Sequence, residues 1–125
     1  MKTNISSSQA PQAIGPYSQA ILAGNLLFIS GQLGLTPGGA MAAPDAPAQA
    51  RQALENIKSI LSAAGLSMVD VVKTTVFLID LNDFASVNQL YEEYFQAPYP
   101  ARACVQVAAL PKGGRVEIEA MAVKN

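Results

Sequence analysis

The chain has 125 residues, a formal net charge of −1, no histidine and one cysteine. This length suits a single domain over residues 1–125, and the absence of excess or clustered basic charge argues against nucleic acid as a partner. One cysteine excludes an intrachain disulfide, and the lack of histidine removes the commonest metal ligand and the usual general base.

The N-terminal residues Met1–Ile5 lead into serines and not into the apolar stretch of a signal peptide. Farther along, no apolar run approaches the roughly 20 residues that a membrane-spanning helix needs. We therefore expect a soluble, cytoplasmic protein that does not bind membranes.

Two strand-like runs, Tyr17–Ala23 and Leu26–Leu33, flank Gly24-Asn25, a dipeptide typical of a two-residue hairpin turn. Counting outward from the turn predicts three cross-strand pairs on one sheet face. These pairs are Ile21 with Phe28, Gln19 with Ser30, and Tyr17 with Gln32. The shared face is apolar near the turn and polar at the open end of the hairpin.

The segment Ala48–Ala64 repeats apolar residues at helical spacing and predicts the first helix, which Gly65 ends. Thr36–Pro47, just before it, is rich in glycine, proline and alanine and predicts a loop. Val69–Ile79 is dense in valine, isoleucine, threonine and phenylalanine, which predicts a buried central strand.

A second helix is predicted from a cap at Asp80 or Asn82 to about residue 95, and Asn88 lies on its apolar stripe. Two strands follow, Arg102–Ala109 and Arg115–Val123. The order β-β-α-β-α-β-β predicts an α+β fold, in which one sheet carries both helices on one face.

Such a sheet leaves its other face uncovered, and the composition is poorly suited to solvate that face. Only 14% of the residues are charged, whereas 50% are hydrophobic. An ordinary soluble domain has about 25% charged residues. We therefore expect a subunit interface to cover part of the apolar surface.

Arg102 is one of three arginines and lies in a strand whose neighbouring side chains are nearly all apolar or small. One interpretation is a structural ion pair with Glu117 or Glu119. The other is a bidentate clamp for the carboxylate of a small ligand. If the last two strands form a simple hairpin, Arg102 and Glu117 are about 13 Å apart along the sheet.

The remaining candidates also allow two interpretations. Glu117 and Glu119 share one face of a strand. Either both are solvated charges, or one of them is partly desolvated and has a raised pKa, which suits it to transfer a proton or orient a water. Cys104 suits a small buried hydrophobe better than a nucleophile, because no histidine is present to activate it. Asn88 is either a hydrogen-bonded core residue or a pocket residue.

Four segments together resemble the RidA proteins of the YjgF family, the enamine/imine deaminases, with a match from about residue 5 to the C-terminus. They are Ile14-Gly15-Pro16-Tyr17-Ser18-Gln19-Ala20, Phe28-Ile29-Ser30-Gly31-Gln32, Tyr99-Pro100-Ala101-Arg102-Ala103-Cys104 and Val116-Glu117-Ile118-Glu119-Ala120. The resemblance implies a chorismate-mutase-like fold with a single mixed β-sheet. It also implies a homotrimer with active sites in the clefts between subunits.

By the same resemblance, Arg102 binds the substrate carboxylate and Glu117 positions or activates the hydrolytic water. The resemblance further implies a set of pocket residues: Tyr17, Ser30, Gly31, Asn88 and Cys104. The implied reaction hydrolyses 2-aminoacrylate, 2-iminobutanoate or related enamines and imines, released by pyridoxal-phosphate enzymes, to 2-keto acids and ammonia. No cofactor or metal is implied.

Two positions depart from the family pattern. Gln106 stands where many members carry glutamate, and the turn Lys112-Gly113-Gly114 is unusually rich in glycine. Both departures bear on substrate preference more than on activity. The alternative from a different class is a non-catalytic trimer that binds small carboxylates or regulates, and ribonuclease or chaperone roles fit the composition less well.

Overall fold

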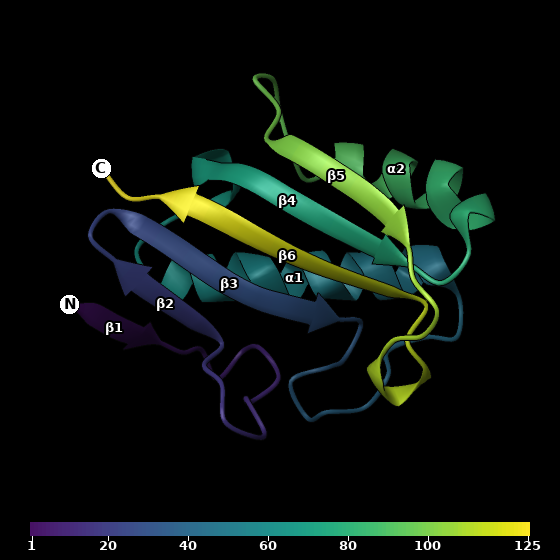
Figure 1. The fold of residues 1–125 in the computed structure, drawn as a ribbon, viewed down its shortest axis with the longest axis horizontal. Coiled ribbons are helices and arrows are strands. Elements are labelled where there is room, and N and C mark those ends of the chain that lie inside the picture. The colour runs from purple at the N-terminus through teal and green to yellow at the C-terminus, as the bar shows by residue number, and fades with distance from the viewer.

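A computed structural model describes residues 1–125. Six strands form one mixed sheet in the order β1-β2-β3-β6-β4-β5, and both α-helices lie behind one face of this sheet (Figure 1). The elements are β1 (Lys2–Ile5), β2 (Ala20–Ala23), β3 (Leu26–Leu33), α1 (Ala46–Ala63), β4 (Val71–Leu78), α2 (Phe84–Glu92), β5 (Ala101–Gln106) and β6 (Val116–Val123). Short 3-10 helices cover Met68–Asp70, Leu81–Asp83 and Pro111–Gly113.

The predicted hairpin forms around Gly24-Asn25, with Ile21 opposite Phe28. The expected strand start at Tyr17 is wrong, because β2 begins only at Ala20 and Tyr17 has no partner in the sheet. The cause is Gln19. Its buried side-chain amide accepts a hydrogen bond from the backbone N–H of Ser7 at 2.7 Å and donates one to the carbonyl of Pro11 at 2.8 Å. These side-chain bonds tie this part of the chain to the N-terminal segment. The predicted neighbour Ser30 of β3 still donates its backbone N–H to the carbonyl of Gln19, at 2.9 Å.

The first helix is confirmed and begins two residues earlier than predicted. Asp45 caps it by accepting a hydrogen bond from the backbone N–H of Ala48 at 3.1 Å. Gly65 follows the helix with φ of +75°, the left-handed conformation that glycine adopts without strain. One face of α1 is buried against the sheet through Ala50, Ala53, Leu54, Ile57, Ile60 and Leu61.

The second helix is shorter at both ends than predicted. Asp80 caps a 3-10 turn over Leu81–Asp83, with its carboxylate accepting from the backbone N–H of Asn82 at 2.9 Å. The α-helix itself runs from Phe84 to Glu92. The predicted cap positions Asp80 and Asn82 therefore belong to the 3-10 turn and not to the α-helix. Phe95 lies beyond the end of the α-helix and packs into the core.

The last two strands, β5 and β6, do not form a hairpin with each other. The hairpin arrangement considered from the sequence for Arg102 and Glu117 is therefore wrong. Strand β4 lies between the two strands, parallel to β5 and antiparallel to β6. A helix-containing crossover favours parallel pairing of the strands it joins, and α2 connects β4 to β5 in this way. Strand β1, which the sequence analysis missed, pairs with β2 at the opposite edge of the sheet.

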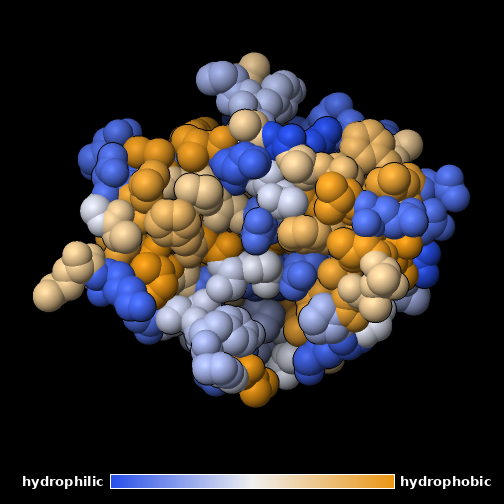
Figure 2. Space-filling model, viewed as in Figure 1, coloured by the Kyte–Doolittle hydropathy of each residue, from blue (hydrophilic) through white to orange (hydrophobic).

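The core lies between the sheet and the helices, whereas the other sheet face remains open. Phe28 and Val105 lie on the open face, and each is 41% exposed. Figure 2 shows this face, where hydrophobic areas flank a more hydrophilic centre. No helix is both long enough and apolar enough to cross a membrane.

Candidate active site

Arg102 extends from the edge strand β5 toward α2. In the sheet it is opposite Thr74, which is fully buried beneath the helices, so the two residues share a face. The Nη1 atom of Arg102 donates a hydrogen bond to Oδ1 of Asn88 at 2.6 Å. The guanidinium carbon lies 4.7 Å from the centre of the Tyr91 ring and 5.5 Å from that of Phe84. One polar and two aromatic groups of α2 therefore hold this charge.

Arg102 is also the only arginine without a carboxylate partner. Arg51 pairs with Glu93 at 3.3 Å, and Arg115 pairs with Asp83 at 3.4 Å. The structural ion pair considered from the sequence is therefore wrong for the isolated chain. The guanidinium therefore keeps free N–H groups that can donate hydrogen bonds to a ligand carboxylate.

Cys104 lies on the same side of β5 as Arg102, opposite Val76 of β4. Its side chain packs against the hydrophobic core. Burial raises the pKa of the thiol, although the positive charge of Arg102 acts in the opposite direction. A raised pKa reduces the thiolate fraction at neutral pH, in agreement with a packing role and against a nucleophilic one.

Glu117 belongs to the open face, where it is opposite Phe77 of β4. Its carboxyl group rests on the backbone of Gly31: a Cβ atom added to Gly31 would lie 2.8 Å from the carboxyl carbon. Burial, with a smaller contribution from the like charge of Glu119, raises the pKa of Glu117. Of the two glutamates, Glu117 is therefore the partly desolvated one that the sequence analysis considered.

Ser30 precedes Gly31 in β3, next to a register irregularity between Ile29 and Gln32. Its hydroxyl donates to the backbone carbonyl of Ser18 at 2.6 Å, so the proton is already used within the chain. Tyr17 is 54% exposed. Neither side chain touches Arg102.

The predicted site residues thus form two groups within one chain. Arg102, Asn88 and Cys104 gather on the helix side at β5, whereas Gly31 and Glu117 lie on the open face. Two strand spacings of about 4.8 Å and an offset of three residues separate Arg102 from Glu117 by roughly 14 Å across the sheet, before the opposite side-chain directions are counted.

The contacts of Phe84 and Tyr91 with Arg102 were not predicted from the sequence. Both residues fall on the apolar stripe of the predicted second helix, which usually means core. The available signal was their spacing with Asn88, because positions 84, 88 and 91 follow i, i+4, i+7 on one helix face. Nothing in that pattern shows that the facing residue is an arginine.

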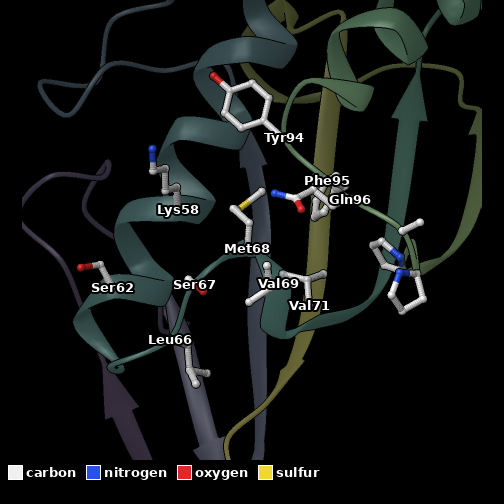
Figure 3. Close-up of a pocket in the computed structure, with 13 residues that line it drawn as sticks. Lys58, Ser62, Leu66, Ser67, Met68, Val69, Val71, Tyr94, Phe95 and Gln96 are labelled. Carbon is white, nitrogen blue, oxygen red and sulfur yellow. The ribbon is translucent and has the colours of Figure 1, made fainter.

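A separate cavity of about 620 Å³ lies between α1, the loop after it and the segment after α2. Figure 3 shows Lys58 and Ser62 approaching it from α1, and Tyr94, Phe95 and Gln96 from the segment after α2. None of the predicted site residues lines it. No group of three or more cysteine, aspartate or glutamate side chains is arranged to hold a metal ion.

A family model described as Endoribonuclease L-PSP matches residues 7–124. A 2-iminobutanoate/2-iminopropanoate deaminase of Bos taurus is 58% identical over 122 residues, which cover 97% of this chain and 89% of the relative. The chain belongs to the YjgF/RidA family. The 2-iminobutanoate/2-iminopropanoate deaminase of Salmonella typhimurium is 52% identical, with full coverage of both chains.

Solved structures of the family have the same fold. The crystal structure of the YjgF gene product from E. coli has a TM-score of 0.94 at 50% identity and covers 98% of this chain and 99% of that one. The crystal structure of E. coli TdcF with bound serine has a TM-score of 0.93 at 49% identity, with the same coverage. The predicted YjgF-type α+β fold is confirmed.

Proposed function

We propose that this YjgF/RidA protein is a deaminase that hydrolyses 2-iminobutanoate and related enamines and imines to 2-keto acids and ammonia. The observation that carries the proposal is Arg102, whose guanidinium is fixed by α2 and has no carboxylate partner in its own chain. The names of the relatives at 52% and 58% identity support the same reaction. Their substrates are small imino acids, each with one carboxylate for such a clamp.

In the proposed reaction, Arg102 binds the substrate carboxylate through two parallel N–H groups. The enamine tautomerises to the imine, and water adds to the imine carbon. Glu117 accepts a proton from this water, and the upward shift of its pKa makes its carboxylate a stronger base for this task. Glu117 passes this proton to the imine nitrogen to give the carbinolamine, and it then carries the hydroxyl proton to the same nitrogen. The C–N bond breaks, ammonia leaves and the 2-keto acid remains, so the chemistry uses only a clamp, a proton carrier and an oriented water.

The two groups of site residues support a site shared between chains. A short imino acid does not span roughly 14 Å and two sheet faces, so Arg102 and Glu117 of one chain do not serve the same substrate molecule. We infer a homotrimer in which Arg102, Asn88 and Cys104 of one subunit face Glu117 of its neighbour. The neighbour also supplies Tyr17, Ser30 and Gly31 to this cleft. The exposed apolar residues of the open face fit burial at such an interface.

The test is a coupled reaction. A pyridoxal-phosphate threonine dehydratase generates 2-iminobutanoate from threonine, and the rate of 2-ketobutanoate release is followed with and without the protein. We expect faster release with the protein and no acceleration with Arg102→Ala. Binding of 2-ketobutanoate without any acceleration would instead support the non-catalytic carboxylate-binding trimer.

The charge distribution favours a small carboxylate over RNA as the ligand, although the family description names an endoribonuclease. Two of the three arginines are engaged in ion pairs, and the net charge is −1. A protein that binds a polyanion needs several free cations on one surface. The expected cytoplasmic location and the absence of a cofactor stay predictions.

A further inference from the structure

Helix α2 presents three side chains to the guanidinium of Arg102. Asn88 accepts its hydrogen bond, while the rings of Phe84 and Tyr91 lie beneath the guanidinium carbon. We propose that Phe84 and Tyr91 are positioning residues that hold Arg102 in the geometry in which it receives a substrate carboxylate. This inference rests on the proposed function and extends it to two residues that do not touch the substrate.

An arginine on an exposed edge strand is ordinarily mobile, because its long side chain has several rotatable bonds. Each rotamer that binding freezes out reduces affinity, so a side chain ordered in advance binds more tightly. Aromatic faces suit this task, because they attract the cation without using its in-plane N–H donors. Only one hydrogen bond, to Asn88, uses an Arg102 donor within the chain.

The Tyr91 ring is itself fixed to the core. Its hydroxyl shares a 2.8 Å hydrogen bond with the hydroxyl of Thr74, which is fully buried. Its ring packs against Phe95 with the two centres 4.5 Å apart. Arg102 therefore packs against a ring that the core itself holds in place.

Phe84 differs from Tyr91 in being only partly covered, at the first residue of α2. Its ring is farther from the guanidinium than that of Tyr91, at 5.5 Å against 4.7 Å. Because attraction between a cation and a ring weakens with distance, we expect Tyr91 to contribute more than Phe84.

The test compares Tyr91→Leu and Phe84→Leu, which remove an aromatic face while keeping an apolar side chain. For Tyr91→Leu we expect a KM for 2-iminobutanoate raised about 10-fold with kcat within about 2-fold, the pattern of lost ground-state binding. For Phe84→Leu we expect a KM raised about 3-fold. Tyr91→Phe restores the ring without the hydroxyl and is expected to recover most of the lost affinity.

A second readout separates positioning from general loosening. The variants are titrated with 2-ketobutanoate and with its neutral analogue 2-ketobutanamide. We expect Tyr91→Leu to weaken binding of the acid much more than that of the amide, because only the acid forms a charged, bidentate pair with the guanidinium. Tyr94→Leu is the matched control: it removes a ring just after α2 whose hydroxyl bonds to Glu55 and which stacks on neither Tyr91 nor Arg102, so the acid-to-amide ratio should stay unchanged.

Equal losses for acid and amide in Tyr91→Leu would overturn the inference. The inference would also be overturned if both leucine variants bound the acid as tightly as the wild type while Arg102→Ala bound none. That result would leave the proposed function unaffected. If the wild-type protein fails to accelerate imine hydrolysis, the proposed function fails and the titrations still decide the positioning role. If Tyr91→Leu does not fold, the partly exposed Phe84→Leu decides it.

Discussion

The guanidinium of Arg102 and the side-chain amide of Asn88 are joined by a 2.6 Å hydrogen bond from Nη1 to Oδ1. The acceptor is neutral, so it orients the guanidinium without cancelling its charge. A carboxylate at position 88 would satisfy the same geometry but would neutralise the arginine. The residue type at this position therefore decides whether Arg102 has charge to offer a ligand.

Asn88→Asp is accordingly expected to weaken binding of a small carboxylate. The new side chain is almost the same size but competes with the ligand for Arg102 through a charge-assisted hydrogen bond worth about 1.5–3 kcal/mol. We expect the affinity for 2-ketobutanoate, measured by calorimetry, to fall at least about 10-fold. Thermal stability should not fall. Affinity equal to that of the wild type would show that Arg102 is not the anion site.

Arg102→Ala is expected to reduce imine hydrolysis by at least about 100-fold, since it removes the clamp that orients the substrate. The same variant should change the free energy of unfolding by no more than about 1 kcal/mol, because the side chain is exposed and has no ion pair. Arg51→Ala is the matched control, since it removes an arginine that pairs with Glu93. A comparable loss of activity in the control would point to a general effect of charge.

Gly31→Ala is expected to displace the carboxyl group of Glu117. The new methyl group would lie 2.8 Å from the carboxyl carbon, closer than a real contact allows. Because the clashing atoms are the far end of a flexible side chain that can move, we expect the free energy of unfolding to fall by only about 1 kcal/mol, the low end for overpacked sites, and kcat to fall more than KM rises. Chemical denaturation and the coupled assay measure these two effects.

The double variant Gly31→Ala with Glu117→Ala tests the cause, because it removes the group that clashes. Most of the stability lost in Gly31→Ala should return. Gly38→Ala is the control, since a Cβ atom there meets only Thr36 Oγ1, at 3.9 Å. Equal destabilisation with and without the Glu117 carboxylate would contradict this account.

The raised pKa of Glu117 makes the stability of the protein depend on pH. The folded state binds the Glu117 proton more tightly than the unfolded state does. The contribution of this proton to the free energy of unfolding is therefore complete below the unfolded-state pKa, and it is lost as pH rises through the folded-state pKa. Glu117→Gln should therefore be more stable than the wild type at pH 7. The difference should become small at pH 4, where glutamate is mostly protonated in both states. Urea unfolding of both proteins at pH 4 and pH 7 measures this difference in stability. A difference that grows on acidification would contradict the expected pH dependence.

Much of the fold was predictable from local patterns. Gly24-Asn25 specifies a hairpin turn, and the apolar spacing that ends at Gly65 specifies the first helix, because both signals act between near neighbours in sequence. The insertion of β4 between β5 and β6 was not predictable in this way. Side-chain alternation shows which residues of a strand share a face, but it does not show which strand lies alongside.

The same limit explains the candidate site. The resemblance of four motifs identified Arg102 and Glu117, but only the strand order shows that they occupy opposite faces of the sheet. Tyr91 on a helix stripe looks like any core aromatic, because its contact with Arg102 depends on how α2 crosses β5. Long-range packing therefore supplied what the sequence pattern left open.

In the proposed trimer, Arg102 of one subunit and Glu117 of its neighbour act on one substrate molecule. Co-expression of Arg102→Ala and Glu117→Gln chains with different tags, followed by purification on both tags, yields mixed assemblies. In a cyclic trimer, each such assembly has one cleft with both residues intact, so activity should recover to about one third of the wild-type level per trimer. Activity that stays at the level of the two parent variants would contradict the shared site.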